Sequence, residues 1–480
     1  MADLPSEKRV SMPKPSNKTG AGRGRRGVTI LAAAIAVVAG ATATILMWPQ
    51  PPRAPAVATS PWAPASAPAQ TAPPARTVPR LPSLDNRRSV VVLPFANLGD
   101  PGQAYFVDGI AEDILTALTH FDALLPIAWN SGLAHRGDAD RSGIVRELGA
   151  RYVLEGGVNK AGDRLQMTAR LIDAAPGNAV WEERYDAPLG DIFAIQDDIV
   201  RRIAAATAAN ARGTEFDRAR QKRAEKVEAY DLTLQARALF ADIDKEAMTE
   251  ARLLLARAVQ ADPFYAPAYV WLARVHRDFA NNPWNKEYGG IDGFLQGEIL
   301  LARAIDMQPN NALAHAARAA TLSVLGRHQE ALAEGERALA LGANDAEVLT
   351  LVGNQFRLYG RHDGAIELQV RAMRLDPHYP PSAAALLGRL YVVTSDLVKA
   401  SDAFAECRSR DPEERHCLFD LASVQAQLGR MDEARVALAD LLRLEPAASI
   451  GEYRNLPNRW RDPEDESRMV EGLRKAGLPE

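Results

Sequence analysis

The sequence has few of the residue patterns by which catalytic and cofactor sites are recognised. Gly156 and Gly157 follow an apolar run, but the glycine spacing and the lysine of a phosphate-binding loop are missing there. Two pairs of adjacent carboxylates, Glu112-Asp113 and Asp197-Asp198, fall on expected helices of the amino-terminal half. Neighbouring residues on a helix point about 100° apart, so neither pair converges on one metal ion. We interpret both pairs as solvated helix faces and expect no cofactor.

Nucleophile and metal-ligand patterns are equally scarce. Residue types of a catalytic triad lie close together at Ser131, His135, Asp138 and Asp140. No nucleophile-elbow pattern surrounds this serine, so we attribute the grouping to chance. The eight histidines are scattered, and His328 and His362 fall where an exposed turn between helices is expected. We therefore expect these two histidines to be solvated, and we expect no metal site.

Positive charge is concentrated at the amino terminus and is in deficit elsewhere. Residues 1–27 contain seven Lys or Arg and two acidic residues, a charge of +5, which leaves −9 for the rest of a chain whose total is −4. Phosphate binding needs clustered positive charge. The acidic body therefore argues against nucleic acid as a partner.

An uncharged apolar segment at 28–48 follows the basic lead. Its 21 residues are long enough, as a helix, to cross a hydrocarbon core of about 30 Å, and the preceding basic residues favour a cytoplasmic amino terminus. We expect one transmembrane helix in a bacterial inner membrane and a periplasmic bulk. A cleaved signal peptide ending at Ala41-Thr42-Ala43 is the alternative. Residues 49–86, with eleven Pro and nine Ala, predict an extended linker.

Residues 87–212 alternate strand and helix patterns, which predicts an α/β domain with a mixed sheet. Strands are expected at 89–93, 125–129, 152–158, 165–172 and 179–185. Helices are expected after a cap at Asp108, at 144–148 and at 191–206, the last with an apolar face.

The carboxy-terminal half repeats with a period of about 34 residues. Prolines close helix-like segments at Pro263, Pro309, Pro377, Pro412 and Pro446. Ala343 stands midway in the double interval between the second and third of these. A sustained period of this length is typical of helix-turn-helix arrays. We expect about six repeats over 213–446, with an insertion near 280–293, and a capping segment at 447–480.

Small side chains recur at three positions of this period, which fits tetratricopeptide repeats. Position 8 holds Ala273, Ala319, Gly353, Gly388 and Ala422. Position 20 holds Ala251, Gly297, Ala331, Ala365, Ala400 and Ala434. Position 27 holds Ala258, Ala304, Ala338, Ala372, Cys407 and Leu441. Paired helices that cross at short range need small side chains at the contact, so we expect an all-α solenoid.

Three stretches carry a family resemblance. They read VVVLPFANLGDPGQAYFVDGIAEDILTAL, ARYVLEGGVNKAGDRLQMTARLIDA and VWEERYDAPLGDIFAIQDDIVRRIAAA. They resemble the TolB-like domain that precedes tetratricopeptide repeats in a bacterial family of membrane proteins named after adenylate/guanylate cyclases, and the ending GLRKAGLPE is also similar. The family often carries a cyclase or winged-helix domain on the cytoplasmic side. The 27 residues before the span are too few for either fold, so we expect no cyclase activity.

The resemblance also indicates a binding groove. In this repeat family, positions 9 and 12 of the first helix face the concave side. Here these positions include Arg274, Arg277, Asn354, Arg357 and Arg389. Such a set would favour a protein or peptide ligand with acidic groups. The alternative is that the arginines pair with acidic side chains on adjacent helices.

The two cysteines fall on helices that should be neighbours. Cys407 ends the second helix of one repeat, and Cys417 opens the first helix of the next. An oxidising compartment would permit a disulfide between them. A buried free thiol at Cys407 is the alternative.

Together these observations predict a membrane-anchored periplasmic scaffold or sensory adaptor that binds a protein or peptide and has no catalytic activity. The alternatives are the regulatory half of a cyclase-type signalling system, or an enzyme with unrecognised chemistry in the α/β domain.

Overall fold

The computed structural model describes residues 88–480, apart from 139, 175–176, 208–225, 242–243, 282–289, 457–459 and 461. The expected transmembrane segment at 28–48 and the linker at 49–86 lie outside the described residues. Within the described ranges, no helix combines the length and the apolar character needed to cross a membrane.

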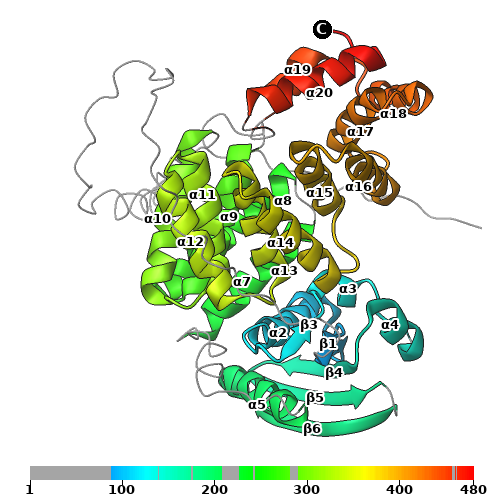
Figure 1. The fold of residues 1–480 in the computed structure, drawn as a ribbon. Coiled ribbons are helices and arrows are strands. Elements are labelled where there is room, and N and C mark those ends of the chain that lie inside the picture. The colour runs from blue at the N-terminus through cyan, green and yellow to red at the C-terminus, as the bar shows by residue number, and fades with distance from the viewer. Residues whose placement is uncertain are drawn as a thin grey trace, which may run out of the picture. The chain divides into compact units, whose positions relative to one another are not determined.

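A mixed sheet opens the described chain (Figure 1). Its strands are β1 (Arg88–Val92), β2 (Ala96–Asn97), β3 (Leu124–Pro126), β4 (Tyr152–Ala161), β5 (Arg164–Asp173) and β6 (Asn178–Pro188). The order is β3-β1-β4-β5-β6, and β2 adds to β4. β1 runs parallel to β3 and to β4, whereas β4, β5 and β6 form an antiparallel meander. The predicted mixed sheet is confirmed.

The apolar pattern of each strand matches the faces that it buries. Val90, Val91 and Val92 of β1 are at most 1% exposed, as a central strand covered on both faces requires. β6 lies at the edge of the sheet, and its residues are exposed or half-buried throughout. The apolar run of β1 therefore lies at the centre of the sheet, and the more polar β6 lies at its edge.

Helices cover both faces of this sheet. They are η2 (Pro101–Gln103), α2 (Ala104–Leu118), α3 (Trp129–Leu133), α4 (Arg141–Leu148), η3 (Leu189–Asp191) and α5 (Ile192–Ala206). α2 and α5 share an apolar core with one face of the sheet. Ile144 and Leu148 of α4 pack with Val91 and Val153 in a second cluster.

Two local predictions were wrong. Asp108 does not cap α2, because the helix begins four residues earlier, at Ala104, and Asp108 instead pairs with Arg136. Trp129 does not end a strand: β3 stops at Pro126, and Trp129 opens α3. The Ile127 amide still donates to the Val90 carbonyl oxygen at 2.8 Å, and the chain then turns into α3.

An array of helix pairs follows the sheet (Figure 1). Its helices are α7 (Val227–Ala238), η4 (Leu239–Ala241), α8 (Lys245–Ala261), α9 (Ala266–Asn281), α10 (Ile291–Met307), α11 (Ala312–Val324), α12 (His328–Leu341), α13 (Ala346–Leu358), α14 (His362–Leu375), α15 (Pro381–Val393), α16 (Leu397–Arg410), α17 (Arg415–Gln427) and α18 (Met431–Leu444). From α11 on, equivalent helices begin 34 or 35 residues apart. The predicted helix-pair solenoid is confirmed.

The small residues of the period lie where the paired helices meet. All of the alanines predicted at positions 8, 20 and 27 are buried, and so is Gly388. A Cβ atom built on Gly388 would come within 2.5 Å of the Phe404 ring on the partner helix. Glycine is therefore required at this close approach between α15 and α16.

The sheet and the first array helices share one apolar core. Tyr230 and Leu234 of α7 belong to the same buried cluster as Phe106 and Ile110 of α2. At the other end of the array, α19 (Ile450–Asn455) and α20 (Pro463–Ala476) pack against the last helix pair. Ser423 Oγ of α17 donates to the Met469 carbonyl oxygen at 2.6 Å.

Candidate protein-binding surface

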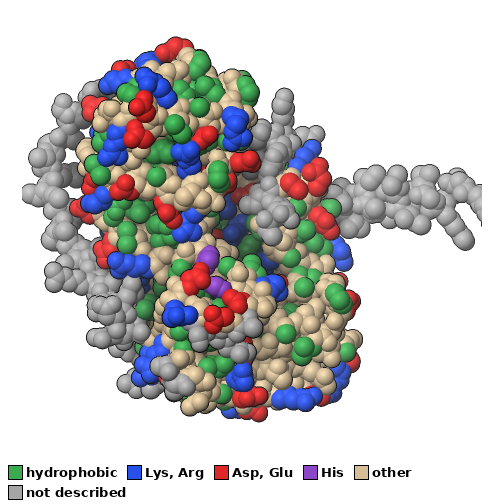
Figure 2. Space-filling model, turned by 90° about the vertical axis from the view of Figure 1, so that its right-hand side faces the viewer, with side chains coloured by type: hydrophobic (Ala, Val, Ile, Leu, Met, Phe, Trp, Pro, Cys, Tyr) green, Lys and Arg blue, Asp and Glu red, His purple; other side chains and the backbone are tan. Residues whose placement is uncertain are grey.

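Charges of both signs are interspersed over one face of the molecule (Figure 2). Arg274, on α9, is one of the predicted groove residues. Its guanidinium lies 4.2 Å from the centroid of the Trp271 ring, and its Nη1 is 2.9 Å from Glu347 on α13. The ion pair spans from the second helix pair to the fourth, so this arginine bridges the array from within.

Arg357 and Asn354, on α13, engage each other. The Arg357 guanidinium donates to the Asn354 side-chain oxygen at 3.0 Å, and Arg357 is 4% exposed. The Asn354 amide oxygen, which was expected to face a ligand, thus already accepts an internal hydrogen bond. On α9, Arg277 Nε donates to the neighbouring Asp278 at 3.3 Å.

Arg389, on α15, belongs to a buried polar chain. Its Nε lies 3.2 Å from Asp420, whose side chain is fully buried. Tyr453 donates its hydroxyl to the same carboxylate at 3.1 Å, and the Trp460 ring nitrogen donates to the Tyr453 hydroxyl at 3.0 Å. The chain connects α15, α17 and the capping segment. Arg274 and Arg389 thus pair with acidic side chains on other helices, as the alternative interpretation expected. Arg277 and Arg357 instead contact partners on their own helices.

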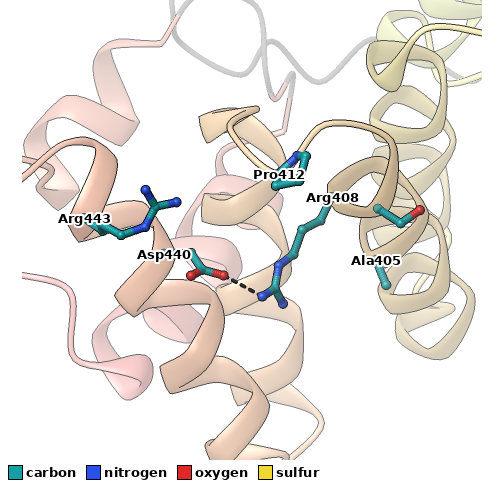
Figure 3. Close-up of a pocket in the computed structure, with 6 residues that line it drawn as sticks. Ala405, Arg408, Pro412, Asp440 and Arg443 are labelled. Atoms are coloured by element: carbon teal, nitrogen blue, oxygen red, sulfur yellow. Dashed lines mark hydrogen bonds and ion pairs between the residues drawn. The ribbon is translucent and has the colours of Figure 1, made fainter.

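A pocket of about 490 Å³ opens farther along the array (Figure 3). Its lining residues are Ala405, Arg408, Ser409, Pro412, Asp440 and Arg443. Arg408 is paired with Asp440 across the pocket, and both side chains are about one-third exposed. Arg443 is exposed at its rim. Because water reaches this ion pair, an incoming carboxylate can compete for Arg408 at modest cost.

The carboxylates of α2 were wrongly interpreted as a solvated face. Glu112 and Asp113 both pair with Arg237 of α7, whose side chain is 11% exposed. Tyr230 also donates its hydroxyl to Asp113, at 2.7 Å. Burial opposes the charge on Arg237, but the two carboxylates outweigh it and raise the pKa of this side chain. The first array helix covers this face of α2, which the sequence pattern did not indicate. On α5, Asp198 likewise pairs with Arg202 and accepts from Tyr185.

Ser131 lies at a contact between α3 and the array. Its hydroxyl donates to Asp376 at 2.5 Å and accepts the His378 amide at 2.9 Å. The Ala128 amide adds a backbone bond of 2.7 Å to the Leu375 carbonyl oxygen. Burial raises the pKa of Asp376, while the hydrogen bond from Ser131 counteracts the shift. The serine of the triad-like grouping thus has a structural hydrogen bond to the turn between α14 and α15.

The two cysteines and His328 lie apart from this contact. Cys407 and Cys417 form a disulfide, with their Cα atoms 6.2 Å apart, and both are fully buried. His328 is exposed, and its Nδ1 lies 3.1 Å from the Tyr359 hydroxyl.

Comparison with known proteins gives one partial relative of substantial identity. The chain is 38% identical over 252 residues to a Rhizobium meliloti protein named "Putative adenylate cyclase 3", an alignment that covers 52% of this chain and 43% of the relative. It is 28% identical over 104 residues to Protein bimA of Emericella nidulans, covering 22% and 13% of the two chains. The chain thus spans less than half the length of these relatives. No family model matches it.

Solved structures of repeat proteins are similar to part of the chain. YrrB, a TPR protein with an unusual peptide-binding site, is 16% identical with a TM-score of 0.31, and covers 40% of this chain and 93% of its own. PilW, a type IV pilus biogenesis factor, is 19% identical with a TM-score of 0.38, and covers 47% and 96%.

Proposed function

We propose that this protein is a scaffold or sensory adaptor that binds a protein or a peptide through its helix-pair array. The observation that carries the proposal is the array itself, whose equivalent helices recur every 34 or 35 residues from α11 to α18. Such arrays stack helices into extended surfaces that act by binding. Because the groove arginines already have partners within the protein, the pocket around Arg408 and Arg443 is the better place for an acidic segment to bind.

Site-specific photo-crosslinking tests this proposal. A photoreactive residue is introduced at Ser409 or Arg443 in the array, and at Glu182 on the exposed edge strand as the matched control. We expect one discrete crosslinked partner from the array positions and none from Glu182. Equal labelling at all three positions, or none, would refute array-mediated binding.

We further propose that the chain is anchored in the inner membrane with its bulk in the periplasm. The basic lead at 1–27 and the uncharged segment at 28–48 support this topology. Alkaline phosphatase fused after Glu480 should be active, and the fusion should fractionate with membranes. A soluble product that begins near Thr44 would instead support a cleaved signal peptide.

A second candidate function is regulation of a cyclase-type signalling system, which the name of the 38% identical relative favours. If the scaffold proposal is right, the purified full chain should convert neither ATP nor GTP to a cyclic nucleotide. Turnover that persists through rigorous purification would make the protein an enzyme.

A further inference from the structure

Three side chains from separate segments converge next to the contact made by Ser131. They are His135, which follows α3, Glu147 of α4, and His378 in the turn between α14 and α15. One ligand atom from each lies within 4.8 Å of the other two. His378 Nε2 is 2.8 Å from Glu147 Oε1, and His135 Nε2 is 3.8 Å from the same oxygen. The two imidazole rings stand edge to face, with centroids 5.5 Å apart.

His135 has a nitrogen that the described part of the chain leaves unsatisfied. Its side chain is 10% exposed, and its Nε2 has no hydrogen-bond partner among the described residues. A buried polar atom without a partner is destabilising, so its presence needs an explanation such as an ion or an ordered water. This nitrogen lies beside Glu147 and His378.

The other nitrogen of the His135 ring lies near a carboxylate. Nδ1 is 3.6 Å from Asp138 Oδ2. Metal-binding histidines commonly donate their second ring N–H to a carboxylate, which fixes the tautomer and orients the free lone pair toward the metal. With the proton on Nδ1, Nε2 presents its lone pair to the cluster.

The ligand set suits a zinc-like ion. Two imidazole nitrogens and one carboxylate match Zn²⁺ and similar transition metals, whereas Ca²⁺ and Mg²⁺ prefer oxygen ligands. Tetrahedral Zn²⁺ with bonds of about 2.0–2.1 Å places its ligand atoms roughly 3.3 Å apart. The two distances to Glu147, 2.8 and 3.8 Å, bracket this value, and the ligand atoms of the two histidines lie within 4.8 Å of each other. Side-chain movements of about 1 Å would therefore complete the site.

We propose that His135, Glu147 and His378 bind one zinc-like divalent ion that fastens the turn between α14 and α15 to the α/β domain. Two ligands come from the α/β domain and one from the array, so the ion is a crosslink between them. The hydrogen bond from the His378 amide to Ser131 holds the third ligand in place before the ion arrives. The fourth coordination position is left to water or to a group from a partner.

Metal titration of the full chain, purified with a tag that contains no histidine, tests the proposal. After chelator treatment, we expect one Zn²⁺ per chain, and a higher melting temperature with Zn²⁺ than without it. His378→Gln should weaken Zn²⁺ binding at least tenfold and abolish the thermal shift. Asp138→Asn should weaken it about tenfold without changing the stoichiometry, as loss of an outer-shell carboxylate does. His328→Gln, which removes an exposed histidine outside the cluster, should change neither.

Zn²⁺ binding that is absent, or identical in the wild type and in His378→Gln, would overturn the proposal. If a variant fails to fold, X-ray absorption at the zinc edge of the Zn²⁺-loaded wild type identifies the ligands of the ion and so tests the proposal. Two imidazole ligands with additional oxygen ligands support the site, and a coordination shell without imidazole refutes it.

Discussion

Gly388 and Phe404 provide a test of how the helix pairs pack. A Cβ atom on Gly388 would lie 2.5–2.8 Å from three atoms of the Phe404 ring, and that ring is fully buried. The next helix pair places Ala422 and Leu438 at the equivalent positions, both buried. The array therefore combines glycine with phenylalanine in one pair, and alanine with leucine in the next.

Gly388→Ala should destabilise the array. Overpacking costs about 1–3 kcal/mol, and the higher helix propensity of alanine returns about 1 kcal/mol, so we expect a net loss of up to roughly 2 kcal/mol. Gly353 is the matched control, because it occupies the same repeat position and its added Cβ would meet nothing closer than 3.5 Å. Gly353→Ala should be neutral or slightly stabilising.

The double variant makes the test specific. Phe404→Leu alone should cost about 1–2 kcal/mol for the space that it leaves. Gly388→Ala with Phe404→Leu recreates the alanine–leucine pair of α17 and α18, so the two changes should couple favourably by at least about 1 kcal/mol. Denaturant unfolding followed by circular dichroism measures the four stabilities. Additive effects, or a Gly388→Ala protein as stable as Gly353→Ala, would refute the packing argument.

Two further predictions concern buried charge. Asp345 caps α13 by accepting from the Glu347 and Val348 amides, while burial and the charge of Glu347 raise its pKa from 3.8 to about 6. The folded state therefore holds this proton more tightly than the unfolded chain, and stability is lost as pH rises through the interval between these values. Asp345→Asn keeps a capping side chain, so it should raise the melting temperature at pH 7.5 and have little effect near pH 4; an equal effect at both would contradict the assignment. Arg389→Ala removes the guanidinium from the buried Asp420 carboxylate and should cost about 3 kcal/mol. Arg274→Ala, whose partner Glu347 is 43% exposed, should cost about 1 kcal/mol or less. Thermal melts of the two variants compare these costs, and equal melting temperatures would show that Arg389 is not a structural partner.

Most of the fold could be predicted because it depends on local periodicity. The strand pattern at 152–158 became β4, and the apolar face at 191–206 became α5. The 34-residue period and its small residues placed the helix pairs, because close helix crossings allow only small side chains at the contact. The end of β3 was missed, because the apolar run continues past Pro126, the last residue of the strand.

Pairing between side chains was much harder to predict. The sequence presented Arg357 and Arg389 as candidates for a ligand, and left open whether they pair internally. Arg357 donates to Asn354 on its own helix, whereas Arg389 reaches Asp420 on α17. The second pairing depends on how neighbouring helix pairs pack, which the repeat pattern does not specify. The same holds for Arg237, which neutralises two carboxylates of α2 from a helix more than 100 residues away.

The sequence by itself determined the succession of strands and helices along the chain and the helix-pair array, because each element has its own hydrophobic period and its own terminating residues. The order of the strands within the sheet was left to the tertiary structure. Only the tertiary structure decided which face of the sheet the array covers and which polar groups meet there. His378 lies 231 residues from Glu147 in the chain, yet their side chains are in hydrogen-bond contact. No local pattern encodes such a contact, because it depends on the accumulated geometry of every helix pair between the two residues.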